Sequence, residues 1–133
     1  MRSFSLEIVT PDGLAYSGEA ESLLIRTTDG DVEILAAHAD FVAALAIGRA
    51  RILKDGESRF ASVQGGFITV EKGAVKVVAT TFEFAEIIDT ERAKRAAENA
   101  EAKRAQASTA RDLALAEARL KRALNRLNVA DMK

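Results

Sequence analysis

The stretch FEFAEIIDTERA, residues 82–93, separates two parts of the chain that differ in composition. All eight glycines, the single proline and every aromatic residue lie at or before position 84, and the remainder is mostly Ala, Leu, Lys, Arg and Glu. The balance of charge changes at the same place, because residues 1–85 carry 8 basic and 12 acidic side chains and residues 86–133 carry 11 and 8. We therefore predict two structural units, residues 1–85 and residues 86–133.

Residues 1–85 have the pattern of a small all-β domain. β-branched and aromatic residues form short runs between turn-forming pairs, and Asp55-Gly56 suits a two-residue hairpin turn because both residues tolerate a positive φ. The runs are too short for helices and include residues 4–8, 23–27, 50–53, 67–70 and 75–79. Many short strands without intervening helices favour a β-sandwich, or flattened barrel, over a parallel α/β sheet.

Residues 86–133 have the pattern of two helices. Asp89 precedes the first helical run and is placed to act as its N-cap. A second helix start, Thr109-Ala110-Arg111-Asp112, has the form of a capping box and is followed by an apolar stripe. The stripe consists of Leu113, Ala116, Leu120, Leu124 and Leu127. We expect an antiparallel hairpin joined near Ser108; one continuous helix is the alternative, because neither Gly nor Pro stands at the joint.

The first of these helices offers little apolar surface. Its apolar face is almost wholly alanine, at positions 93, 96, 97 and 100. Each small side chain buries little area, and buried apolar area stabilises by about 25 cal/mol per Å². We therefore expect a weakly closed hairpin; the alternative is a rigid one in which the alanines allow close packing.

Several function classes lack the residues that they require. The 133-residue chain has no cysteine, has a single histidine, and contains no phosphate-loop, dinucleotide-binding, zinc-protease or nucleophile-elbow pattern. We therefore expect no enzyme activity, catalytic cofactor or metal site, and we expect His38 to be a structural or interface residue. The net charge of -1 gives no reason to expect a nucleic-acid partner. No apolar run approaches the roughly 20 residues of a membrane span, so we expect a cytoplasmic chain without direct membrane insertion.

A basic stripe lies on the second predicted helix. Arg119, Arg122 and Arg126 are spaced at i, i+3 and i+7 and therefore share one face. Guanidinium groups at such a face can hold phosphate oxygens through paired hydrogen bonds. A solvated basic surface is the alternative.

Three segments carry a resemblance to a known family. They are Ile8-Val9-Thr10-Pro11-Asp12-Gly13, Gly65-Gly66-Phe67-Ile68-Thr69-Val70, and the ending from Leu120 to Lys133. In order and spacing, over the whole chain, they resemble the epsilon subunit family of bacterial F-type ATP synthases. One departure lies at Ala36-Ala37-His38, where that family commonly has Pro-Gly-His.

The resemblance implies a β-sandwich that docks on the gamma subunit and the c-ring of the central stalk. It further implies a non-catalytic rotor subunit that couples proton flow to ATP synthesis, on the cytoplasmic face of the bacterial cell membrane. The helical hairpin of such subunits can extend toward the catalytic head and restrain ATP hydrolysis. Arg119, Arg122 and Arg126 would then contact the beta subunit, with the alpha subunit nearby.

The resemblance also implies a regulatory ATP site in the folded hairpin. Members that bind ATP share a motif of the form Ile/Leu-Asp-x-x-Arg-Ala, and here Ile88, Asp89, Arg92 and Ala93 match it. The other expected contacts with ATP are Glu83, Arg122 and Arg126. One position departs from the pattern, because Asn99 stands where some members have a basic residue. Carboxylates would accept hydrogen bonds from adenine or ribose, and arginines would neutralise the triphosphate.

Two alternatives to this function stay open. The chain could be a purely mechanical coupling subunit in which Asp89 only caps a helix and the arginines serve the beta subunit. It could also be an unrelated β-sandwich adaptor whose basic hairpin binds an acidic partner.

Overall fold

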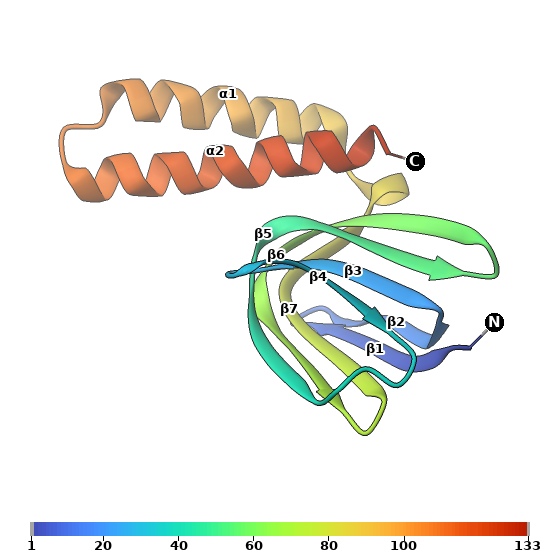
Figure 1. The fold of residues 1–133 in the computed structure, drawn as a ribbon. Coiled ribbons are helices and arrows are strands. Elements are labelled where there is room, and N and C mark those ends of the chain that lie inside the picture. The colour runs from blue at the N-terminus through green and yellow to red at the C-terminus, as the bar shows by residue number, and fades with distance from the viewer. Residues whose placement is uncertain (1, 133) are drawn as a thin grey trace. The chain divides into compact units, whose positions relative to one another are not determined.

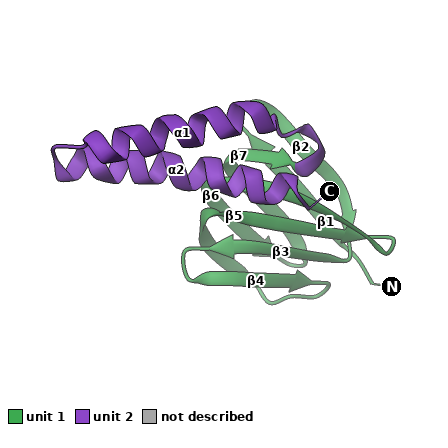
Figure 2. Ribbon diagram, turned by 90° about the horizontal axis from the view of Figure 1, so that it is seen from above, with its two compact units in different colours: residues 1–84 green, residues 85–133 purple. Residues whose placement is uncertain are grey.

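A computed structural model describes residues 2–132, which form two compact units that divide between Phe84 and Ala85 (Figure 2). The first unit is a single seven-stranded sheet that curls over on itself (Figure 1). Its strands are β1 Phe4–Thr10, β2 Gly13–Ala20, β3 Ser22–Thr27, β4 Gly30–Leu35, β5 Phe41–Lys54, β6 Glu57–Glu71 and β7 Ala74–Phe84. The predicted β-sandwich followed by helices is confirmed.

The strand order is β2-β1-β7-β6-β5-β3-β4. Neighbouring strands are antiparallel except for β1 and β7, which pair in parallel from Ser5↔Ala74 to Val9↔Val78. The first and last strands of the sandwich therefore lie side by side within the sheet, with β2 beyond β1 at one edge.

Alternation along the strands decides which side chains enter the core. Phe4, Leu6 and Ile8 of β1 are buried, and the side chains between them are more exposed. In β7 the buried side chains are Val75, Val77 and Ala79 and then, after a one-residue shift, Phe82 and Phe84, and they join the same cluster. The pattern read from the sequence in β1 is thus the pattern that closes the core.

The glycine pair in the middle of β6 has a steric cause. Gly65 and Gly66 have φ values of 69° and 106°, which L side chains rarely adopt. A Cβ atom added to Gly66 would also lie 2.0 Å from the carbonyl oxygen of Val78 on β7. Only glycine lets β6 approach β7 at this position.

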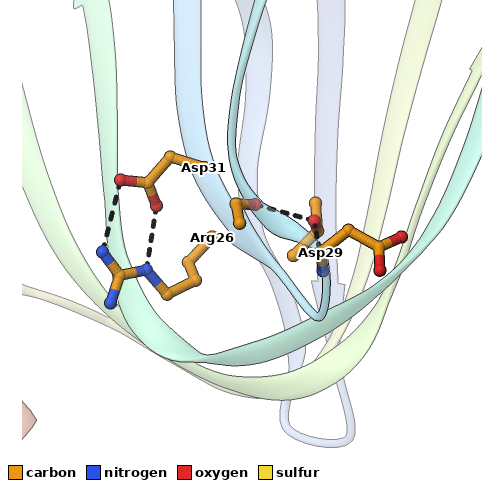
Figure 3. Close-up of polar contacts among 5 residues, drawn as sticks. Arg26, Asp29 and Asp31 are labelled. Carbon is orange, nitrogen blue, oxygen red and sulfur yellow. Dashed lines mark hydrogen bonds and ion pairs between the residues drawn. The ribbon is translucent and has the colours of Figure 1, made fainter.

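The hairpin turns follow their sequence signals. Asp55 and Gly56 have φ values of 53° and 78°, so the two positive angles expected of this turn are present. The β3–β4 turn is held by side chains (Figure 3). There the Thr27 hydroxyl accepts from the backbone N–H of Asp29 at 3.1 Å and donates to the carbonyl oxygen of Gly30 at 2.7 Å.

Arg26 and Asp31 are cross-strand partners at the same turn, and the guanidinium donates to both carboxylate oxygens, at 2.9 and 3.3 Å (Figure 3). This hydrogen bonding lowers the pKa of the Asp31 carboxyl. Because the pKa of Asp31 is depressed in the folded state, the pair stabilises the fold at neutral pH. This stabilisation is lost as the pH falls through the folded-state pKa of Asp31. Gly48 leaves room for Arg26, since a Cβ there would lie 2.7 Å from the Arg26 Cβ.

The second unit is a helical hairpin that follows a short 3-10 turn, Ala85–Ile87. Its helices, α1 Thr90–Gln106 and α2 Ala110–Ala130, run antiparallel beside each other (Figures 1 and 2). An Asp89 carboxylate oxygen accepts from the N–H of Arg92 at 3.0 Å, and the Thr109 hydroxyl accepts from the N–H of Asp112 at 3.0 Å. Both expected N-caps are confirmed, and the single-helix alternative is wrong because the chain is extended at Ala107.

Within the apolar stripe of α2 the leucines are not the most buried members. Leu113 and Leu124 are exposed, and Leu120 and Leu127 are only half-buried. The fully buried positions along the middle of the two helices are Ala93, Ala100, Ala116 and Ala123. Small side chains allow the helices to approach closely, and the longer leucines then lie beside the contact.

The loop that departs from the resembled family has a strained residue. Ala37 has a φ of 63°, where an alanine is costly by roughly 1–2 kcal/mol and glycine is not. In the same loop the His38 Nδ1–H donates to the carbonyl oxygen of Ala39 at 2.7 Å, and the ring packs edge-on against Phe41.

We predict that Ala37→Gly stabilises the sandwich by about 0.5–1 kcal/mol, because relief of the left-handed strain exceeds the entropy that glycine adds to the unfolded chain. Urea unfolding followed by the fluorescence of Tyr16, the single tyrosine of a chain without tryptophan, measures the change. Ala39→Gly is the control, because Ala39 has no positive φ and the same exchange should destabilise there. Equal effects of the two substitutions would contradict the strain.

Candidate functional site

A cleft runs between the two helices of the second unit. It encloses about 270 Å³ and is lined by Ala96, Asn99, Ala100 and Lys103 of α1 and by Arg119, Arg122 and Arg126 of α2. Helical periodicity explains the lining, because residues three, four or seven positions apart share a face. The alanines keep one wall low, and the long basic side chains form the other.

The cleft is strongly positive. Four of its lining residues are cationic, and none of the lining residues that the structure describes is acidic. Lys103, Arg119 and Arg122 take part in no ion pair within residues 2–132. Two cations of α1 outside the cleft lining do pair, in Lys94–Glu91 and Arg104–Glu101. Uncompensated cations beside apolar walls raise the local concentration of anions.

The motif at the start of α1 lies outside this lining. Asp89 caps the helix and Arg92 is exposed, although Arg92 stands one turn before Ala96 and so continues the same face. Ile88 and Ala93 are buried. Four of the residues proposed from the sequence therefore gather at the beginning of the hairpin.

The other proposed residues lie in two places. Arg122 and Arg126 line the cleft together with Asn99. Glu83 belongs to the first unit, where it is half-buried on β7 opposite Ser62 of β6. The structure thus brings two of the expected phosphate contacts together in one cleft.

Lys103 is a cleft residue that the sequence reasoning missed, and Arg119 was assigned only to a contact with the beta subunit. The helical spacing in the sequence indicated both residues. Lys103 stands four residues after Asn99, one helical turn along the same face, and Arg119 begins the basic stripe that Arg122 continues. Only the pairing of the two helices shows that the two faces meet.

A second candidate surface lies on the outer face of the sandwich. Apolar residues that are partners in register form a row across five strands, which we call the outer apolar row. The row consists of Leu14, Val9, Val78, Phe67 and Ala44, in the order β2-β1-β7-β6-β5. Leu14 and Phe67 are 60% and 45% exposed, and Val42 beside the row is 74% exposed. Contiguous exposed apolar surface of this kind marks sites of protein association.

Comparison with protein families assigns both units. Residues 3–85 match the family described as ATP synthase, Delta/Epsilon chain, beta-sandwich domain, and residues 86–131 match its long alpha-helix domain. The chain belongs to the ATP synthase delta/epsilon family. The resemblance drawn from the sequence is thereby confirmed.

Similar members of this family are bacterial ATP synthase epsilon chains. That of Bacillus velezensis is 42% identical, with 98% of each chain covered, and that of Shouchella clausii is 39% identical, with 100% of this chain and 98% of the relative covered. Among solved structures, a chain of the Euglena gracilis mitochondrial ATP synthase, resolved with OSCP, F1 and the c-ring, has a TM-score of 0.83 and 26% identity. That match covers 96% of this chain and 81% of the other.

The fold recurs in a more distant chain. A chain of the Tetrahymena thermophila mitochondrial ATP synthase central stalk and c-ring has a TM-score of 0.64 at 12% identity, which shows the fold alone. Within residues 2–132 of the chain described here, no helix combines the length and apolar character of a membrane span.

Proposed function

We propose that the chain is a non-catalytic rotor subunit of the central stalk of a bacterial F-type ATP synthase. It couples proton flow to ATP synthesis from the cytoplasmic face of the membrane, to which it is joined through the complex. The family match over residues 3–131 carries this proposal. The similar chain resolved in the Euglena gracilis assembly with F1 and the c-ring supports it.

The sandwich docks on the gamma subunit and the c-ring. The outer apolar row supports the contact with gamma, because the row offers exposed apolar surface over five strands of one rigid sheet. An aromatic residue near the middle of such a surface is a candidate for a large share of the binding energy, and here that residue is Phe67.

We predict that Phe67→Lys weakens binding to the gamma subunit by about 2 kcal/mol, or roughly thirtyfold. The Phe67 side chain is partly exposed, so the sandwich should keep its urea-unfolding midpoint. Titration of purified gamma with the variant measures the loss. Leu35→Lys is the control, because Leu35 is similarly exposed, at 51% against 45%, but lies on β4 at the far edge of the sheet. Undiminished binding by Phe67→Lys would remove the outer row from the gamma contact.

The hairpin regulates ATP hydrolysis. In an extended state its basic residues Arg119, Arg122 and Arg126 contact the beta subunit, with the alpha subunit nearby, and restrain the motor. The alanine contact between α1 and α2 supports such opening. At about 0.8 kcal/mol per buried carbon, the four alanine side chains along the middle of the helices contribute only roughly 3 kcal/mol.

We predict that removal of residues 86–133 leaves ATP synthesis coupled and raises ATP hydrolysis by the assembled complex. Coupling persists because the docking surface lies in the sandwich. Hydrolysis rises because the hairpin that restrains it is absent. The measurement compares hydrolysis and proton pumping in membranes that carry the full or the shortened chain. Unchanged hydrolysis over a range of ATP and salt concentrations would rule out inhibition by the hairpin.

ATP acts as a regulatory ligand that holds the hairpin closed. Its proposed contacts are divided between Glu83, Ile88, Asp89, Arg92 and Ala93 on one side and Arg122 and Arg126 on the other. A ligand that binds only the closed state stabilises it by RT ln(1 + [L]/Kd), about 2.7 kcal/mol at a hundredfold excess. That is comparable with the packing that closes the hairpin. The positive cleft lined by Arg122 and Arg126 supports this role.

We predict that Arg122→Ala weakens ATP binding to the isolated chain by about ten- to a hundredfold, because one charge-assisted phosphate contact is lost. Calorimetric titration with ATP measures the change, and Arg111→Ala on the exposed part of α2 is the matched control. Asp89→Asn adds a second test, because asparagine keeps the N-cap while removing the charge.

The same titration decides between an ATP-binding regulatory subunit and a purely mechanical coupling subunit. The alternative is a coupling subunit without nucleotide binding, in which Asp89 serves only as a helix cap and Asn99 stands where a cation is expected. Absence of ATP binding by the unaltered chain at millimolar concentration would establish that alternative.

A further inference from the structure

Lys103 and Arg119 lie at a special point of the hairpin cleft. Both residues line the cleft, and both also line a second cavity of about 280 Å³ toward the loop that joins the helices. The second cavity is lined in addition by Gln106, Ala107, Asp112, Leu115 and Ala116. The two cavities therefore meet at Lys103 and Arg119.

The cations of the cleft form a row rather than a cluster. From Arg119 to Arg126 the helix rises seven residues, or roughly 10 Å at 1.5 Å per residue. Arg122 stands between them on the same face, and Lys103 faces this row from α1. A row of this length matches an extended chain of several phosphate groups better than it matches a single anion.

The row has a defined end. Beyond Lys103 and Arg119 the second cavity contains the carboxylate of Asp112 among its described lining residues. A negative side chain there disfavours the entry of a further anion. The last phosphate of a chain in the cleft would thus stop beside Lys103 and Arg119.

We propose that the cleft binds a polyphosphate chain lengthwise and that Lys103, with Arg119, holds its terminal phosphate. This rests on the ATP binding of the proposed function and assigns the residues that read the third phosphate of the nucleotide. Lys103 supplies, one turn farther along α1, the cation that Asn99 does not supply. The ammonium and the guanidinium both donate charge-assisted hydrogen bonds to phosphate oxygens.

Lys103 also makes phosphate binding sensitive to closure. The three arginines of the cleft all belong to α2, so they keep their mutual spacing whether or not α1 packs beside them. A ligand shifts a conformational equilibrium only by its differential affinity for the two states. Lys103 is the cationic lining residue that belongs to α1, and a phosphate held between it and Arg119 joins the two helices.

The test compares Lys103→Gln with Lys121→Gln in the isolated full-length chain. Lys121 is exposed on α2 and lines neither cavity, so the control has the same loss of charge. Calorimetry is performed with ATP, ADP and inorganic tripolyphosphate. We expect Lys103→Gln to weaken ATP and tripolyphosphate binding about tenfold, with ADP affected less than about threefold, and Lys103→Arg to restore the affinity for ATP.

Helix closure gives a second readout. The described chain has no free cysteine, so labels at Glu98→Cys and Glu117→Cys, both exposed, report the distance between α1 and α2. ATP should shorten this distance in the parent and in Lys121→Gln, and saturating ATP should shorten it less in Lys103→Gln.

The outcomes separate this inference from the proposed function. If ATP binds but Lys103→Gln lowers the affinities for ATP and ADP equally, or not at all, the assignment of Lys103 is overturned and the ATP site stands. If ATP does not bind but tripolyphosphate binds with dependence on Lys103, the nucleotide proposal fails and the polyphosphate cleft stands. If neither binds, both are overturned.

Discussion

The alanine contact between α1 and α2 sets the properties of the second unit. Because the buried positions along the middle of the helices are Ala93, Ala100, Ala116 and Ala123, the helices pack there with little apolar area and with little free energy. The same small residues keep one wall of the neighbouring cleft low, so that basic side chains from α2 face α1 across open space. A larger residue in this contact would bury more area and would also fill the site.

Weak packing and concentrated charge act together. The cations that line the cleft repel one another when it is empty, and an anion would remove that repulsion. A hairpin held by a large apolar core would be insensitive to such a change. If an anion binds in the cleft as we propose, it would act on weak packing, which is the condition for a ligand-controlled equilibrium.

Much of the fold follows from local sequence signals. The Asp55-Gly56 turn and both N-caps depend on residues within a few positions of each other, and the structure has them where the sequence places them. The five predicted short runs all lie in strands, but the runs did not show β2 or β4, nor that β5 and β6 extend over 14 and 15 residues. The apolar stripe of α2 did not indicate which of its members would be buried, because hydrophobicity alone does not tell which apolar residues meet the partner helix. Small residues occupy that contact because their size allows the helices to approach closely.

The candidate sites are less accessible to sequence reasoning because they depend on partners that are distant along the chain. Lys103 joins the arginines only when α1 lies against α2, and no local pattern gives the rotation of either helix. The outer apolar row needs the register of five strands, including the parallel pairing of Val9 with Val78. The sequence shows each of these residues as an isolated apolar position. That same pairing also orders events during synthesis, because β1 has no partner on its β7 side until residues 74–78 have left the ribosome. At about 5–20 residues per second, β1 and β2 wait for roughly 3–13 seconds, whereas the later hairpin can form from contacts that are close in sequence. The newly made N-terminus therefore spends its first seconds as an unfinished sheet edge, open to chaperones and to pairing with other nascent chains.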